Sequence, residues 1–317
     1  MNSYTYFPGC SCSSEGGAKA YNWSIQAISK VLDFELRELD DWNCCGSTPS
    51  TSVDELGSYC LAARDLALAE KNGMDMVTPC SACYVIFNRT NSSLKAYPKL
   101  KAKVDKALSA GGLKYDGNVK VRHTLDILTR DIGYDAIKAK VKRPLNGLKI
   151  APYYGCQAIR PDFGFDHPES PESLDKLITN LGGEATPFPL KTHCCGGSLI
   201  FSEETMALEL THKLLESAAS NGAECIITVC PLCQTNLDAF QIRVNKKYKT
   251  NYKLPVLFFT QLMGITFGLE EKTLGLKNSV VPMDKVLAKI GQGVVSWSER
   301  SGCMSATAAL ISPGWWI

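Results

Sequence analysis

The sequence lacks several features that mark particular classes of protein. Its 34 lysine and arginine residues nearly balance 32 aspartate and glutamate residues, and no long basic block is present, which argues against nucleic-acid binding. No run of about 20 apolar residues predicts a transmembrane helix. The opening stretch, MNSYTYFPGC, has neither the basic nor the apolar region of a secretory signal. We therefore expect a cytoplasmic protein with no nucleic-acid partner and no transmembrane segment.

Two common cofactor motifs are also missing. The chain has no C-x2-C-x2-C-x3-C-P run, which is typical of bacterial ferredoxins. It has no G-x-G-x-x-G after a predicted strand, which would indicate a dinucleotide site. If the protein does redox chemistry, we expect its electrons to come from other subunits.

Cysteine, by contrast, is abundant, with 14 residues in 317. In a reducing compartment, grouped cysteines more often bind metal or do redox chemistry than form structural disulfides. Most of them follow one pattern, C-x33/37-CC-x34-C-x2-C, which occurs twice. A pattern of this length in two copies predicts a tandem duplication of a whole domain. The first set is Cys10, Cys44, Cys45, Cys80 and Cys83, and the second set is Cys156, Cys194, Cys195, Cys230 and Cys233.

The remaining four cysteines have no counterpart in the other repeat. We expect Cys60 and Cys225 to be small core residues. Cys12 lies two positions after a member of the first set, and Cys303 lies beyond both repeats. The repeats predict a first domain over 1–146, with a helical connection from about residue 104, and a second over 147–285. The tail, 286–317, repeats nothing and is assigned no function.

Each half shows the same order of predicted strands and helices. Apolar runs such as YTYF and LKIAPYY end at Gly-Cys, and further strands lead into the CC and CxxC motifs, each followed by a helix. Alternating strands and helices predict parallel sheets with right-handed crossovers. The expected fold is α/β, with two duplicated Rossmann-like domains, each a parallel sheet flanked by helices. The cysteine motifs follow the carboxyl ends of strands, where ligands of such sheets bind.

Five thiols at the carboxyl edge of one predicted sheet are compatible with three kinds of chemistry. A zinc ion needs four ligands, so one thiol would be left over. Thiol–disulfide exchange needs only the CxxC pair and leaves the other three unexplained. An iron–sulfur cluster takes thiolate ligands and is wide enough to contact both members of a CC pair. A fifth thiolate would bridge two irons or add a coordination position, which would open the usual cube.

The sequence resembles the B subunit of heterodisulfide reductase, the family defined by tandem cysteine-rich CCG domains. The resemblance covers residue 1 to about 285. It is carried by DWNCCGS, TPCSACY, IRPDFGFDHPESPESLDKLI, CCGGSL, TVCPLCQTNLD and PVLFFTQLMGITFGL. It implies two [4Fe-4S] clusters of the noncubane type, with the first and second cysteine sets as their ligands.

The resemblance also implies a catalytic role. In the archaeal enzymes of methanogenesis the substrate is the mixed disulfide of coenzyme M and coenzyme B, which is reduced to two thiols. Two facing clusters would each supply one of the two electrons. The implied partners are a heterodisulfide reductase A-like flavoprotein and a C-like ferredoxin-type iron–sulfur subunit. The alternative is a non-catalytic electron-transfer subunit of a bacterial sulfur-oxidising or electron-bifurcating flavoprotein complex. A zinc-stabilised scaffold is the third possibility.

Residues outside the two sets are weaker candidates. His193 adjoins Cys194 and is a candidate proton donor to a departing thiolate. Arg160 follows Cys156 by four positions and is a candidate for binding an anionic group of the substrate, or for pairing with Asp162. The other histidines, which have no cysteine neighbours in the sequence and which we expect to be structural or solvated, are His123, His167 and His212.

Overall fold

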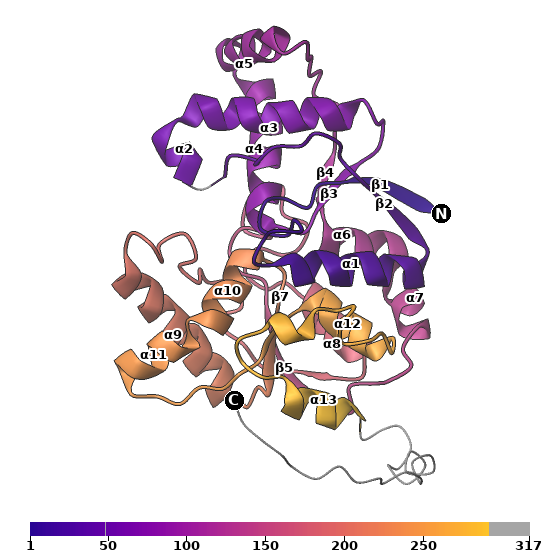
Figure 1. Cartoon of the computed structure of the whole chain (residues 1–317), viewed down its shortest axis with the longest axis vertical. Helices are drawn as coiled ribbons and strands as arrows, with labels where there is room; N and C mark the ends of the chain where they lie inside the picture. Colours follow the sequence, from indigo (N-terminus) through magenta and orange to yellow (C-terminus); the bar gives the residue numbers. More distant parts are fainter. Residues whose placement is uncertain (48, 292–317) are drawn as a thin grey trace, which may run out of the picture.

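Two parallel four-stranded sheets, one from each half of the chain, form the framework of the protein (Figure 1). The computed structural model describes residues 1–47 and 49–291. The strand orders are β2-β1-β3-β4 and β6-β5-β7-β8, and every neighbouring pair is parallel. The matching orders confirm the predicted α/β fold and its duplication. The strands are β1 (Asn2–Tyr6), β2 (Phe34–Glu38), β3 (Met76–Thr78), β4 (Val121–His123), β5 (Lys149–Tyr153), β6 (Glu184–Ala185), β7 (Cys225–Thr228) and β8 (Val256–Phe258).

The inner strands β3 and β7 are fully buried, whereas the edge strands β2 and β6 are partly exposed. All residues of β3 and β7 are buried, while β2 becomes exposed toward its end and β6 has only two residues. Helices on both faces of a parallel sheet produce this pattern. Apolar and β-branched runs such as CIIT therefore form the centre of each sheet.

The helices of the first half are α1 (Lys19–Leu32), α2 (Pro49–Val53), α3 (Glu55–Glu70), α4 (Ser81–Ala96), α5 (Pro98–Ala110), α6 (Thr124–Ile127), the π-helix η1 (Leu128–Ile132) and α7 (Tyr134–Ala139). The segment from 104 onward, predicted as a helical connection, also contains β4, which completes the first sheet.

The helices of the second half are α8 (Ser173–Asn180), α9 (Glu204–Ser220), α10 (Pro231–Ala239), α11 (Gln241–Tyr248), α12 (Phe259–Thr266), the 3-10 helix η2 (Leu276–Asn278) and α13 (Asp284–Gly291). The start of α13 falls at the boundary predicted for the tail. Cys303 and most of that tail lie outside the described residues.

The two halves pack against each other through α1 and α12, which lie side by side in Figure 1. The ring of Tyr21 on α1 stacks on Phe258 of the second half, with ring centroids 4.1 Å apart and planes 6° from parallel. Its hydroxyl donates a hydrogen bond to the Val229 carbonyl at 3.2 Å. Ser24 and Thr260 share a buried hydrogen bond of 2.6 Å. Because these contacts are buried, they fix the orientation of one sheet relative to the other.

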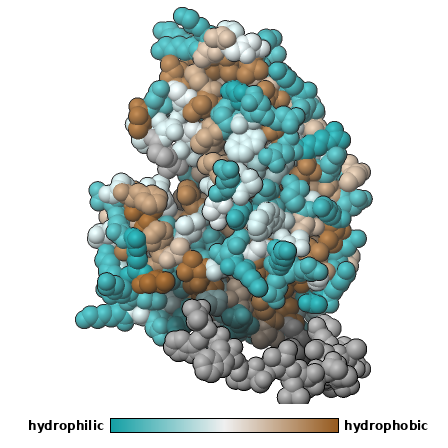
Figure 2. Space-filling view, in the orientation of Figure 1, coloured by the Kyte–Doolittle hydropathy of each residue, from teal (hydrophilic) through white to brown (hydrophobic). Residues whose placement is uncertain are grey.

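The surface mixes apolar and hydrophilic residues. Figure 2 shows hydrophilic and apolar side chains interspersed over one face, and a notch in the outline between the two halves. Among the exposed apolar side chains are Val53 at the end of α2 and Phe201 just before α9. Both lie on segments that follow a CC motif.

Candidate metal centres

The motif cysteines follow the carboxyl ends of the strands, as the sequence predicts. Cys80 and Cys230 come two residues after β3 and β7, and each is the N-cap of the helix that follows, α4 or α10. The positive end of a helix dipole favours the thiolate form of a cysteine. Both CxxC motifs therefore begin at the positive end of a helix.

A glycine before the first cysteine of each set makes room for the CxxC motif. Gly9 and Gly155 have φ angles of +74° and +67°. A Cβ atom at either position would lie 3.0 Å from a thiol sulfur, that of Cys83 or Cys233 respectively. Any larger residue would therefore be strained in its backbone and would crowd the last thiol of its own set.

The glycine of each CCG motif has a similar double role. Gly46 and Gly196 have φ angles of +74° and +75°. An added Cβ would lie 3.2 Å from the Ser58 Cα on α3, or 2.9 Å from the Ala207 Cα on α9. The motif needs glycine because the turn after the two cysteines is left-handed and rests directly on a helix backbone.

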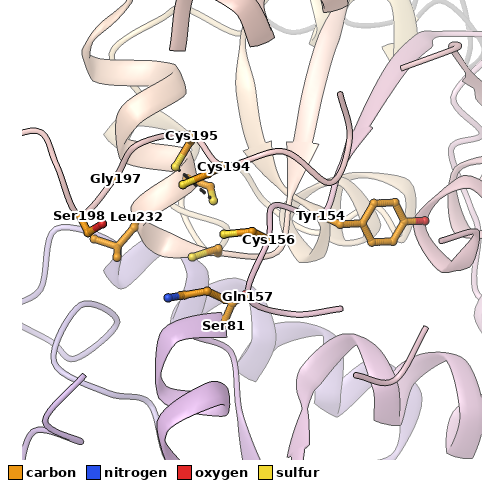
Figure 3. Close-up of a pocket in the computed structure, with 11 residues that line it drawn as sticks. Ser81, Tyr154, Cys156, Gln157, Cys194, Cys195, Gly197, Ser198 and Leu232 are labelled. Carbon is orange, nitrogen blue, oxygen red and sulfur yellow. Dashed lines mark hydrogen bonds between the residues drawn. The ribbon is translucent and has the colours of Figure 1, made fainter. Parts of the chain in front are cut away.

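The second set lines a single cavity (Figure 3). All five of its thiols border this cavity, and so does Ser81, which comes from the first half at the start of α4. The sulfur atoms of Cys195 and Cys233 are 3.5 Å apart. A hydrogen bond from the Cys156 thiol lowers the pKa of Cys194 to about 6, and the Gly196 amide donates to the same sulfur at 3.3 Å. One thiolate is therefore stabilised before any metal binds.

The first set repeats the close pairing of thiols. The sulfur atoms of Cys45 and Cys83 are 3.2 Å apart. A hydrogen bond from the Cys10 thiol, followed by one from Cys45, lowers the pKa of Cys44 to about 2. Cys10 and Cys44 are exposed while the other three thiols of the set are buried, so the set reaches from the protein interior to the surface.

The two sets adjoin each other at the boundary between the halves. Cys80 shares a hydrogen bond with Cys230, which raises the pKa of Cys80 well above its ordinary value. The pKa of Cys230 is lowered well below its ordinary value, first by its hydrogen bond with Cys233 and then by the one with Cys80. The CxxC motifs of the two halves thus face one another.

The donor set fits a group wider than one ion. Within 1–47 and 49–291, no three Cys, His, Asp or Glu side chains converge on a single-ion position. The second set offers five thiols around its cavity, one more than the four ligands of a tetrahedral zinc ion. An iron–sulfur cluster, whose irons are bound by separate thiolates, fits this donor set.

The weaker candidates have mixed outcomes. Arg160 lies close enough to Cys194 to help lower the pKa of that thiol, and its ion pair is with Glu169 at 3.8 Å rather than with Asp162. The arginine also donates to the Thr192 hydroxyl at 3.4 Å. His193 is exposed beside Cys194, and its backbone carbonyl accepts a hydrogen bond from Tyr153 at 2.7 Å.

The structure also shows the burial of three cysteines outside the two sets. Cys225 is fully buried in β7, which confirms the prediction. Cys60 is partly buried and packs against the hydrophobic core where it borders a groove between α3 and α5, so the prediction of a core position is met only in part. Cys12 is fully buried, and the charge of Cys230 acts on it from the other half.

Two polar residues near the cysteines were not predicted as part of the site. Asp65 on α3 is buried behind the first CC pair and accepts a hydrogen bond from the Asn43 amide at 2.9 Å. Burial raises the pKa of Asp65 to about 7. His123, predicted to be structural or solvated, is fully buried and hydrogen-bonds the Pro79 carbonyl, next to Cys80. Neither residue stands near a motif cysteine in the sequence, so spacing gives no signal for them.

Known proteins with similar sequences share the cysteine-rich pattern. The family model of the cysteine-rich domain, CCG, matches residues 4–88 and 150–238. The chain is 35% identical over 285 residues to the 8-methylmenaquinol:fumarate reductase membrane anchor subunit of Wolinella succinogenes, covering 89% of this chain and 98% of that protein. It is 31% identical over 298 residues to the B subunit of the ferredoxin:CoB-CoM heterodisulfide reductase of Methanosarcina mazei, covering 92% of this chain and 97% of that one.

A solved structure supports the fold. A hypothetical protein from Helicobacter pylori superposes with a TM-score of 0.70 at 16% identity, over 89% of this chain and 52% of that one. The chain thus spans about half the length of that structure. In the described part of the chain, no helix is both long and apolar enough to cross a membrane. The cysteine pattern, the family match and the relatives agree, and the chain belongs to the cysteine-rich CCG domain family that includes the heterodisulfide reductase B subunits.

Proposed function

We propose that this chain is the catalytic iron–sulfur subunit of a heterodisulfide reductase-like complex. Each cysteine set would hold one [4Fe-4S] cluster of the noncubane type. The observation that carries the proposal is that Ser81, the neighbour of Cys80, lines the cavity of the second set, because this brings both sets to one place at the boundary between the halves. Clusters bound there would supply electrons one at a time to a shared substrate. The ligands would be Cys10, Cys44, Cys45, Cys80 and Cys83 for one cluster, and Cys156, Cys194, Cys195, Cys230 and Cys233 for the other.

The proposed reaction is the reduction of a small disulfide such as coenzyme M–coenzyme B disulfide. Cleavage of one S–S bond takes two electrons and two protons and yields two thiols. Two adjoining one-electron centres match this requirement without a flavin on the chain itself. The electrons would come from a heterodisulfide reductase A-like flavoprotein by way of a C-like ferredoxin-type subunit, in a cytoplasmic complex.

The protein's own groups would bind and orient the substrate. Ser81, Gln157 and Ser198 give the cavity polar hydrogen-bonding groups, while Leu232 makes part of it apolar. Arg160 stands close enough to Cys194 to attract a carboxylate or sulfonate of the substrate. His193, which is exposed next to Cys194, would deliver a proton to a departing sulfur.

The 35% identity to a subunit of 8-methylmenaquinol:fumarate reductase favours a second candidate function. Here the chain would be a non-catalytic electron-transfer subunit of a flavoprotein complex. Such a subunit uses the same clusters but binds no disulfide. The two candidates therefore differ in whether a substrate sulfur reaches the metal.

Paramagnetic resonance spectroscopy on anaerobically purified protein separates the two candidates. The expected result is a signal from the reduced or half-oxidised clusters that changes on addition of coenzyme M–coenzyme B disulfide. A menaquinol analogue should leave that signal unaltered. If neither the disulfide nor the thiols change the signal and the quinol reduces the clusters, the catalytic proposal is wrong and the electron-transfer function is supported.

A further inference from the structure

His123 occupies the meeting point of the two CxxC turns. It ends β4, its side chain has no exposed surface, and its ring lies where the two halves touch. Its Nε2 atom is 3.1 Å from the carbonyl oxygen of Pro79, the residue before Cys80. The carbonyl of Val229, the residue before Cys230, acts on the same ring from the other half. One imidazole therefore stands beside the backbone that leads into both CxxC motifs.

The hydrogen bonds fix which nitrogen of His123 donates. The backbone amide of Leu125 donates to Nδ1 at 3.1 Å, so this nitrogen carries no proton. Nε2 must then carry the proton and donate it to the Pro79 carbonyl. The Pro79 carbonyl is buried and would be left unpaired without this donor, so the hydrogen bond holds the turn before Cys80 in place.

The second half also contacts the His123 ring. Phe165, on the loop that follows Cys156, stacks on His123 with ring centroids 5.6 Å apart and planes 16° from parallel. Tyr84, the residue after Cys83, meets both rings edge to face and donates a hydrogen bond to the Phe163 carbonyl at 2.6 Å. The loop after Cys156 is thus tied to the CxxC helix of the other half.

The duplication shows what is distinctive about this residue. Phe258 is the counterpart of His123, because it ends β8 at the position where His123 ends β4. A ring from the other half stacks on each of them: Tyr21 on Phe258, and Phe165 on His123. Phe258 has no donor, and the Val229 carbonyl receives its hydrogen bond from the Tyr21 hydroxyl instead. Both turns before the CxxC motifs are therefore anchored, but only the first uses an imidazole that also touches the other half.

We propose that His123 is a positioning residue that links the turn before Cys80 in the first half to the loop after Cys156 in the second half, so that the geometry of each metal centre depends on that of the other. The inference rests on the proposed function only in assuming that the cysteine sets hold iron–sulfur clusters. It does not require a disulfide substrate. Hydrogen bonds and packing around cluster ligands set the reduction potential, so a change at His123 should alter the potentials of both centres.

The test compares His123→Phe with His123→Gln. Phenylalanine keeps the ring that stacks on Phe165 but removes the donor, whereas the glutamine amide restores a donor near the position of Nε2. We expect both variants to keep the wild-type iron content. His123→Phe should shift the midpoint potentials and resonance line shapes of both centres, and His123→Gln should bring them back toward wild type. His212→Gln serves as control, because His212 stacks on Tyr248 away from the cysteines.

A second variant covers the case in which His123→Phe does not fold. Phe165→Leu removes the stacking ring and leaves every ligand and His123 unchanged. Although Phe165 belongs to the second half, the variant should shift the midpoint potential of the first centre. The signal of the first centre is the one that is lost in Cys45→Ser. Wild-type potentials in His123→Phe, or a shift confined to the second centre in Phe165→Leu, would overturn the proposal. An iron-free wild-type protein would instead contradict the proposed function.

Discussion

Asp65 is a single residue whose protonation is linked to folding. Its carboxyl group is buried beside Asn43 and Cys44, and burial raises its pKa to about 7 from an ordinary value near 3.8. The fold therefore disfavours the ionised form. The stability associated with the neutral carboxyl group is complete below about pH 4 and is lost as the pH rises through about 7.

Replacement of Asp65 by asparagine should remove this pH dependence. Asparagine keeps an oxygen that can accept from the Asn43 amide, and it cannot ionise. The melting temperature of Asp65→Asn minus that of wild type should therefore be more positive at pH 8.5 than at pH 6. Each unit of difference in pKa between the folded and unfolded states corresponds to about 1.4 kcal/mol of stability. Anaerobic thermal unfolding at the two pH values measures this difference. Asp135→Asn makes the same charge change at an exposed position, and an equal pH effect in that variant would contradict the explanation.

The residues of the site differ in how well the sequence predicts them. The motif cysteines follow from spacing alone, because two copies of one pattern leave little freedom in alignment. Asp65 and His123 do not, since their importance comes from burial and from partners far along the chain, such as Phe165 for His123. The periodicity of apolar residues predicts which face of a helix or strand is buried. It cannot predict which polar side chain hydrogen-bonds a turn that carries the motif cysteines.

The loops after Cys10 and Cys156 are the elements that place the first thiol of each set. Each loop contains a glycine whose Cα lies close to the backbone of an earlier residue in the same loop. A Cβ on Gly16 would lie 2.2 Å from the Ser11 carbonyl oxygen, and one on Gly164 would lie 2.3 Å from that of Ile159. Contacts this short cannot be kept, so an alanine at either position must displace the loop backbone.

Alanine at each glycine should cost iron at the centre whose loop it displaces and leave the iron of the other centre in place. Gly16→Ala should alter the signal of the first centre and Gly164→Ala that of the second, each with a loss of about 1–3 kcal/mol of stability. Gly17→Ala is a matched control, because a Cβ there meets nothing within 4 Å. Paramagnetic resonance and iron analysis of the three variants measure the effect. Equal damage to both centres in either variant would show that the loops do not act locally.

At the level of elements, strand and helix order is predicted better than element ends. Strand, motif and helix alternate as expected in both halves, and the resulting sheets have identical orders. The strand predicted before the second CC motif shrinks to the two residues of β6, because the chain then leaves the sheet edge. Local propensity favours a strand there, but an edge strand pairs on one side only and ends where its neighbour stops contacting it.

The whole molecule combines two independent ligand sets with one shared boundary. Each set belongs to its own sheet, so the loss of one ligand should cost one cluster only. We expect about eight irons per chain in the wild type and about four in Cys45→Ser or Cys195→Ser. Cys60→Ser should keep all eight, because Cys60 lies in a separate groove.

The contact between Cys80 and Cys230 adds a second expectation for the same variants. When one cluster is missing, the thiols that faced it are free to relax, and the signal of the remaining centre should shift although its own ligands are intact. Iron analysis and resonance spectroscopy on one sample measure both effects. Loss of all iron in Cys45→Ser would mean that the halves assemble only together. Half the iron with an unshifted signal would mean that the sets adjoin without influencing each other, and a concerted two-electron reaction would then lose its structural support.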